Sequence, residues 1–418
     1  MINLERLYLI RVPQNIFAIP KYSFGLACIY AGMLIAYWGS LNPWFMWPIG
    51  NFYIIFSSLL LCTSMAIGAS MKDNTLFNND NYLIPFLIHI LLSYYLLFVN
   101  GGHIGGFIFN LFNISVFLSF FWVNKDLLPD ILTFIAKAMA ILLGVSIVAY
   151  VFYLVGFPLP SRDAEFNDGF YSYRNYFFFM IDQRTELELF PRFHSVFLEP
   201  GHLGSACVLL LLTQCGKWKK WYNVILLTAT LMSFSLAAYV MLIVTVFLNL
   251  WIQGKHFIGK LIIAITIIAT ITIGSFFYRN GDNLLHNLIV MRLEIYDGEM
   301  VGNNRVTEDF DVEFENYLGS SDIFIGRDMP KDMFGNSGYK VFIYENGLIG
   351  FLLIFLLYLT SMRNTAYWKA LTASVILALL AFIVRGYPLW YSNFLPLFAM
   401  AHIKKSCFNN TEENDSIL

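Results

Sequence analysis

Long apolar runs recur along the whole chain and constrain its fold more than any other feature. A helix needs about 20 apolar residues to cross the hydrocarbon core of a bilayer, and about twelve runs approach this length. Such runs fold as helices because hydrocarbon offers no partner to an open backbone N–H or C=O group. The sequence therefore predicts an all-α polytopic membrane protein with about 12 transmembrane helices. These are expected at residues 23–39, 51–69, 82–99, 104–123, 131–156, 195–214, 221–235, 237–252, 258–278, 340–361, 366–384 and 387–402.

The composition excludes several classes of protein. Hydrophobic residues make up 58% of the 418 residues and charged residues 13%, whereas soluble proteins are about 45–50% apolar and about 25% charged. A soluble enzyme or a disordered chain is therefore excluded. The net charge of −2 offers no attraction to a polyanion, so we expect no nucleic-acid partner. The five Cys form no CxxC pair and show no zinc spacing, and we expect neither a metal nor a cofactor.

Lysine and arginine are distributed unevenly between the predicted spans. If the N-terminus is cytoplasmic, most basic residues lie in inside connections, whereas the outside connections 40–50 and 100–103 contain none. Basic residues are retained on the cytoplasmic side of a membrane. We therefore expect both termini to be cytoplasmic. No small-residue cleavage site follows the first apolar run, which predicts a retained helix rather than a signal peptide.

Two connections are long, and both are predicted to lie outside. Loops longer than about 12–15 residues are uncommon unless they are functional or disordered, and the aromatic composition of both argues against disorder. In the second loop, DFDVEFENYLG (309–319) alternates apolar with polar residues, which predicts an extended segment. We expect function at the outer face. The expected organisation is helices 1–5 in 1–156, a loop at 157–192, helices 6–9 in 193–278, a loop at 279–339, helices 10–12 in 340–402 and a cytoplasmic tail at 403–418.

Arginine dominates the predicted outer connections. These contain nine Arg and two Lys, whereas the inner set contains three Arg and twelve Lys. A guanidinium grips phosphate or carboxylate through two hydrogen bonds, so the outer set indicates an anionic ligand such as a lipid-linked pyrophosphate. The alternative for any single Arg is an ion pair with a loop acid such as Glu308 or Asp311.

The densest polar motif is RFHSVFLEPGHLG at residues 192–204. If the sixth helix starts with this motif, Glu199 lies two turns below Arg192 on one helix face. An acid near the membrane boundary is costly in lipid, so Glu199 should face protein or water, with His194 and His202 flanking it. The motif predicts a polar site, and a purely structural Arg–Glu pair is the alternative.

A second motif, residues 324–350, is a loop that contains several glycines and leads directly into the predicted tenth helix. Arg327 and Gly338 are separated by ten residues, and the turn that ends at Gly338 could present backbone amides to an anion. Tyr339 follows this turn, and Glu345 lies two turns into the helix, where it should face the bundle. The alternative is a plain loop and helix cap.

A third motif is IVRGYPLW at residues 383–390. Arg385 is the only basic residue in a short outer connection. It could bind the anionic ligand, or its side chain could extend to the membrane–water interface. Arg292 and Arg305, in the second long loop, are further candidates for binding the anionic ligand.

The order of these features resembles the Wzy-type O-antigen polymerases, which belong to a superfamily of polytopic membrane glycosyltransferases that also contains the O-antigen ligases. The resemblance rests on about twelve helices, two large outer loops, the R…FLEP motif entering the middle helix, and a Gly-rich loop ending in a helix that reads GLIG. Related ligases tend to have His-Asn shortly before that helix. The region here reads FGNSGY, which favours the polymerase.

The resemblance implies a GT-C-like fold in the bacterial inner membrane and a metal-independent glycosyl transfer at its periplasmic face. Repeat units linked to undecaprenyl pyrophosphate would be joined, with that lipid pyrophosphate as leaving group, and a chain-length regulator is a further conceivable partner. Glu199 and Arg192 are the predicted catalytic residues. The predicted binding residues are Arg327, Arg385, Arg292, Arg305, Gly338, Tyr339, His194 and Glu345. An O-antigen ligase and a non-enzymatic flippase for lipid-linked sugars are the alternatives.

Overall fold

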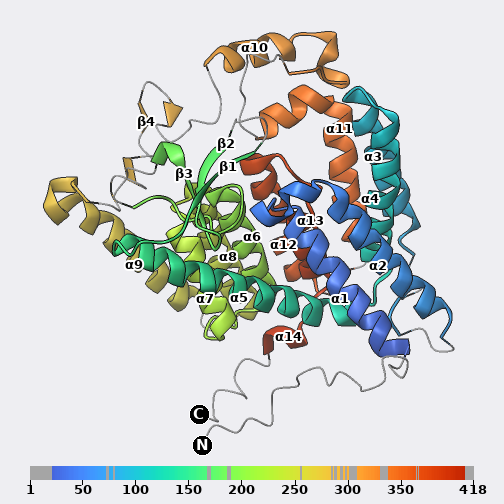
Figure 1. The fold of residues 1–418 in the computed structure, drawn as a ribbon, viewed down its shortest axis with the longest axis horizontal. Helices are drawn as coiled ribbons and strands as arrows, with labels where there is room; N and C mark the ends of the chain where they lie inside the picture. The colour runs from blue at the N-terminus through green and yellow to red at the C-terminus, as the bar shows by residue number, and fades with distance from the viewer. Residues whose placement is uncertain are drawn as a thin grey trace, which may run out of the picture.

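Helices make up most of the chain (Figure 1). The computed structural model describes residues 21–71, 75–78, 81–166, 171–185, 190–254, 257–283, 286, 290–291, 295–296, 299–300, 308–329, 338–363, 365 and 367–409. The helices are α1 (Lys21–Gly39), α2 (Phe52–Ala69), α3 (Leu83–Val99), α4 (Ile104–Trp122), α5 (Leu128–Leu154), α6 (Pro200–Thr213), α7 (Trp221–Met232), α8 (Leu236–Gln253), α9 (Phe257–Phe277), α10 (Glu308–Leu318), α11 (Tyr339–Ser361), α12 (Trp368–Arg385), α13 (Tyr391–His402) and α14 (Ser406–Asn409).

The first long loop carries a small antiparallel sheet. Its three strands, β1 (Arg162–Phe166), β2 (Tyr171–Asn175) and β3 (Met180–Asp182), are arranged in the order β1-β2-β3. The second long loop contains α10 and a two-stranded ribbon, β4 (Ile295–Tyr296) and β5 (Glu299–Met300). Both long connections therefore contain regular structure in their described parts.

Seven helices in the described part of the chain are long and apolar enough to cross a membrane, and three shorter ones, α3, α6 and α7, are also apolar. Every predicted apolar run overlaps one helix, although α6, α7 and α13 are only 12 to 14 residues long. The structure is consistent with an all-α polytopic membrane protein. The figure of about twelve crossings stays a prediction.

Large apolar side chains cover the outside of these helices. Phe98 and Ile104 are each 82% exposed and Ile258 is 70% exposed. In water such exposure forfeits about 25 cal/mol for each Å² of apolar surface, whereas in hydrocarbon it has no such cost. The outer surface of the bundle therefore suits a lipid environment.

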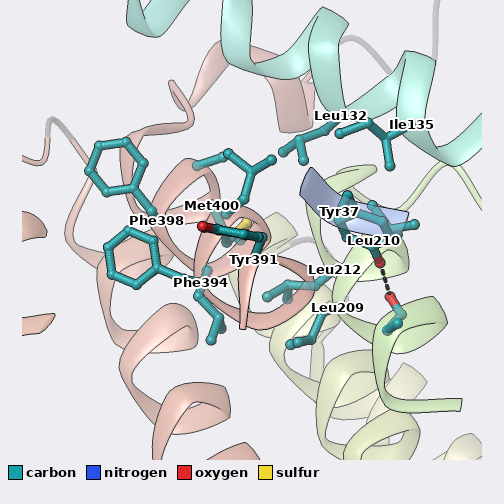
Figure 2. Packing of buried hydrophobic residues seen from close by; sticks show 14 of the residues in the cluster. Tyr37, Leu132, Ile135, Leu209, Leu210, Leu212, Tyr391, Phe394, Phe398 and Met400 are labelled. Atoms are coloured by element: carbon teal, nitrogen blue, oxygen red, sulfur yellow. Dashed lines mark hydrogen bonds between the residues drawn. The ribbon is translucent and has the colours of Figure 1, made fainter. Parts of the chain in front are cut away.

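Two helices, α6 and α13, contribute buried side chains to one apolar cluster (Figure 2). Every residue of α13, and every residue of α6 after Pro200, is buried. Leu210 of α6 and Phe394 of α13 lie in one apolar cluster, and the Tyr37 hydroxyl of α1 donates a hydrogen bond to the Ala206 carbonyl of α6 at 3.0 Å. A helix that is apolar on all sides belongs in a core. The start of α6 and the turn before α13 are therefore held in fixed positions.

The sixth helix begins later than the sequence predicts. It starts at Pro200, and Glu199 has an extended backbone with φ −139° and ψ 147°. Proline has no N–H to donate and disfavours a helical conformation in the residue before it, so it is suited to the first turn of a helix. Arg192 lies outside the helix, and the prediction that Arg192 and Glu199 share a helix face is wrong.

Residues 308–318 form the helix α10, and the prediction of an extended segment at 309–319 is wrong. Phe310, Phe314 and Tyr317 pack together with Tyr344 of α11. These three residues are spaced four and three apart, which is the spacing of one helix face. Val312, the apolar residue that completes the alternating pattern, is 58% exposed. The alternation in the sequence therefore reflected a helix with one apolar face.

The helix α10 and the short helix α14 lie at opposite ends of the molecule (Figure 1). Given the bias in basic residues, we predict that α14 is cytoplasmic and α10 is outside. Green fluorescent protein fused to the C-terminus should fluoresce in cells, and alkaline phosphatase fused after Gly319 should be active. Fluorescence at Gly319 together with phosphatase activity at the C-terminus would reverse the orientation.

Candidate functional site

A buried ion pair joins the start of α6 to the end of α12. Arg385, the last residue of α12, donates from Nη1 to Oε2 of Glu199 at 2.6 Å. The Arg385 and Glu199 side chains are 11% and 24% exposed. The Tyr171 hydroxyl, from β2, donates to Oε1 of Glu199 at 2.7 Å. One carboxylate is thus held by the first long loop, α6 and α12 together.

Aromatic side chains form one wall beside this carboxylate. His202 Nε2, in the first turn of α6, lies 3.7 Å from Glu199 Oε2. The His202 ring packs edge-on against Trp390 at a centroid distance of 4.7 Å, and Trp390 stacks on Tyr387 at 4.3 Å. We call Tyr171, Glu199, His202 and Arg385 the Glu199 cluster. It lies at the point where α6 begins and α12 ends.

Two glycines allow close contacts at the ion pair: Gly201 leaves space for the Arg385 side chain, and Gly386 lets the start of α11 approach the end of α12. A Cβ atom at Gly201 would overlap the Arg385 guanidinium. Gly386 has a left-handed backbone (φ 62°) that ends α12 directly after Arg385, and a Cβ there would lie 2.6 Å from the Gly338 carbonyl oxygen. The start of α11 is thereby packed against the end of α12, beside Arg385.

The charges in the cluster fix its protonation. Burial acts to raise the pKa of the Glu199 carboxyl, but the neighbouring His202 and Arg385 and the hydrogen bonds from Tyr171 and Arg385 lower it below its usual range. Burial and the Glu199 carboxylate raise the pKa of the Tyr171 hydroxyl. Glu199 is therefore ionised and Tyr171 protonated near neutral pH.

Arg385 retains hydrogen-bonding capacity. Its Nε is buried and has no hydrogen-bond partner among the described residues. A buried donor without a partner carries a desolvation cost that an acceptor such as a phosphate oxygen would remove. The cluster thus contains a guanidinium that is paired with a carboxylate and keeps one donor, its Nε–H, for an anionic ligand.

Of the predicted site residues, the structure brings Glu199 and Arg385 together and places Gly338 beside them. The arginine that pairs with Glu199 is Arg385, whereas Arg192 donates from Nε to the Ser233 carbonyl at 3.4 Å. His194 is buried, and its Nδ1 lies 2.6 Å from the Phe197 carbonyl oxygen. His194 therefore has a structural position within the loop rather than an open binding face.

Arg327 belongs to a different group of residues. Its Nη1 lies 2.9 Å from Glu313 Oε1 and its Nη2 lies 3.0 Å from Asp322 Oδ2, and the guanidinium covers the Tyr317 and Tyr344 rings. For Arg327 the alternative of an ion pair with loop acids is correct. These contacts fasten the described part of the second loop to α11.

The remaining predicted residues lie apart from the ion pair or outside the described residues. Tyr339 is the first residue of α11 and is exposed, and Glu345 is half-buried two residues before a break in α11 at Gly347. Arg292 and Arg305 lie outside the described residues, as does the turn at 335–337.

The sequence does not predict Tyr171, Tyr387 or Trp390 as site residues, and it places His202 beside Glu199 without a role. Tyr171, His202, Tyr387 and Trp390 all lie within stretches that the sequence singles out as aromatic or polar. Nothing in the sequence distinguishes Tyr171 from its many aromatic neighbours, because its role depends on a contact between β2 and Glu199, 28 residues further along the chain. His202 stands one helical turn after Glu199, and an i, i+3 spacing from an acid was the available signal.

Comparisons of the chain with protein-family models, with curated proteins and with solved structures find no match.

Replacing Gly201 by Ala should break the ion pair, because the added Cβ displaces the Arg385 guanidinium. Both charges remain in this variant, so the cost is that of an overpacked site, about 1–3 kcal/mol. We expect a clear fall in the thermal midpoint of the purified protein. Gly274→Ala in α9, where a Cβ meets open space, is the matched control and should leave the midpoint unchanged or slightly raised. Equal midpoints for both variants would contradict the packing described.

The lowered pKa of Glu199 also predicts a dependence of stability on pH. A carboxyl whose pKa is depressed in the folded state contributes fully above about pH 4.3, and this contribution is lost as the pH falls towards the folded pKa. Between pH 7 and pH 3.5 the parent protein should therefore lose more thermal stability than Glu199→Gln. Parallel curves for the two proteins would show that the carboxyl has an ordinary pKa.

Proposed function

We propose that this chain is a Wzy-type glycosyltransferase that polymerises undecaprenyl-pyrophosphate-linked oligosaccharide repeat units into O-antigen or a similar surface polysaccharide. The observation that carries the proposal is the buried Arg385 guanidinium, which is locked by Glu199 and keeps an unpartnered Nε. Twelve crossings, a GT-C-like arrangement and a periplasmic site in the bacterial inner membrane belong to the same proposal.

The proposed reaction is a glycosyl transfer. A hydroxyl oxygen of one repeat unit attacks the anomeric carbon of the other, a new C–O bond forms, and the bond to the lipid pyrophosphate breaks with its electron pair. The leaving group gains negative charge, which a preorganised guanidinium stabilises in a partly buried site. Arg385 is the residue that would contact this pyrophosphate.

Glu199 has two roles in this proposal. Its carboxylate holds Arg385 in one orientation, and it accepts a hydrogen bond and then the proton from the attacking hydroxyl. The lowered pKa makes Glu199 a weak base. A weak base suffices because the hydroxyl becomes acidic as its oxygen bonds to the anomeric carbon.

The contacts of Arg327 and Arg192 bear on the roles that we propose for these two residues. Arg327 pairs with Glu313 and Asp322 and so holds the second loop, and its buried Nε, like that of Arg385, has no partner among the described residues, so it stays a candidate for the pyrophosphate. Arg192 is proposed to shape the loop at the entrance to α6, where it donates to Ser233. Arg292 and Arg305 keep their place as candidates for the same anion.

The proposal predicts that Arg385→Lys and Glu199→Gln impair polymerisation. Lysine lacks the planar fork, and loss of a preorganised donor lowers the rate of such reactions about 10²-fold or more. The measurement is polymer length on a gel of surface polysaccharide from a deletion host that carries each variant, at matched expression. Arg184→Lys is the control, because Arg184 is 68% exposed and pairs with Asp182 in the same loop. Normal long chains in both site variants would refute the assignment.

The deletion host also separates the alternatives. Loss of the gene should leave core lipid capped with single repeats if the protein is a polymerase. Loss of all capping would instead support a ligase or a flippase. Purified protein in nanodiscs should release undecaprenyl pyrophosphate from lipid-linked repeats, and movement of the substrate without release would identify a flippase.

A further inference from the structure

A cavity of about 340 Å³ lies beside the Glu199 cluster. Its walls come from α2, α3 and α4, from the residue after α1, and from the turn that leads into α13. The polar lining includes Tyr53, Ser93, Asn110, Asn113 and Tyr391, and Trp390 lines the cavity next to them. Cavities of about 300–1,000 Å³ with apolar walls and a few convergent polar groups are typical of small-molecule sites.

The chemistry of the lining favours an uncharged, amphipathic ligand. No residue that lines the cavity carries a charge, and apolar side chains such as Leu97 and Phe109 alternate with amides and hydroxyls. A pyrophosphate would find no cation on these walls, and a polyisoprenoid chain would leave the amides without partners. A sugar ring presents an apolar C–H face and an edge of hydroxyls, and therefore matches both kinds of wall.

The amides of the cavity are already oriented. Asn113 Oδ1 accepts a hydrogen bond from the Tyr391 hydroxyl, and Asn110 Nδ2 donates to the Ser93 carbonyl at 2.8 Å. The described part of the chain gives no hydrogen-bond partner to Asn113 Nδ2, to Asn110 Oδ1 or to the Trp390 indole N–H. Two donors and one acceptor thus remain for hydroxyl groups of a ligand.

Trp390 connects the cavity to the Glu199 cluster. It lines the cavity, and its ring lies 4.7 Å from that of His202, whose Nε2 is 3.7 Å from Glu199 Oε2. The Trp390 and His202 rings therefore lie in series between a ligand in the cavity and the carboxylate.

We infer that this cavity binds an uncharged sugar unit of the acceptor oligosaccharide, so that an adjoining unit of the same oligosaccharide reaches Glu199. The inference rests on the proposed glycosyl transfer, and it assigns to this transfer a neutral acceptor subsite separate from the pyrophosphate site at Arg385. Asn110, Asn113 and Trp390 are the residues that would recognise the sugar.

The test is photocrosslinking of the full-length protein in the membranes of its host. A diazirine analogue of leucine replaces Leu97, which lines the cavity, or Leu111, which is 59% exposed on α4. Mass spectrometry of the adducts should find neutral sugar masses at Leu97 and only lipid masses at Leu111. Lipid alone at Leu97, or no adduct there, would overturn the inference.

A kinetic measurement accompanies the crosslinking. Asn113→Leu should raise the KM for lipid-linked repeats about tenfold and reduce the sugar adduct at Leu97, with little change in kcat. Leu111→Ala is the matched control on the same helix and should change neither quantity. An unchanged KM in Asn113→Leu at normal expression would contradict the role of the amide.

The outcomes distinguish this inference from the proposed function. Sugar adducts at Leu97, with polymer length insensitive to Arg385→Lys and Glu199→Gln, would support the sugar subsite and reject the polymerase mechanism. Polymerase activity that depends on Arg385, with no sugar adduct at Leu97, would reject only the sugar subsite.

Discussion

The largely buried ion pair between Glu199 and Arg385 is the interaction on which the arrangement of the candidate site depends. Two charges withdrawn from water carry a large desolvation cost, which only close pairing and further hydrogen bonds offset. Here Tyr171 supplies the further hydrogen bond, so the first loop is fixed at the same point. Removing one partner would leave an uncompensated charge between the start of α6 and the end of α12. The geometry of the loop, of α6 and of α12 therefore depends on one carboxylate.

The fold separates charged from neutral chemistry. The Glu199 cluster concentrates charge at the start of α6, whereas the neighbouring cavity is lined by amides, hydroxyls and apolar side chains. Trp390 belongs to both regions. Such a division suits a reaction in which an anionic leaving group and a neutral nucleophile meet. The acids of the second loop have another use, because Glu313 and Asp322 neutralise Arg327 and so hold that loop against α11.

The parts of the site that local patterns encode were predictable, and the parts that depend on distant contacts were not. Glu199 was identified because an acid at a membrane boundary needs a polar partner. The prediction that Arg192 is the partner of Glu199 is wrong, because α6 begins at Pro200 and Arg192 lies in the irregular segment before it. Arg385 lies 186 residues from Glu199 along the chain, and no local periodicity connects the two. The prediction of an extended segment at 309–319 is wrong because Phe310, Phe314 and Tyr317, which fit an apolar/polar alternation in part, also lie on one face of a helix.

The sequence by itself determined that the chain is built from apolar helices suited to a bilayer. It also determined where those helices lie, because runs of apolar residues and their interruptions are local properties that need no tertiary contact. Only the tertiary structure decided which arginine meets Glu199, that Arg327 pairs with Glu313 and Asp322, and that a neutral cavity adjoins the cluster. These features arise where helices distant in sequence pack together, and their free energy depends on burial and pairing that exist only after packing.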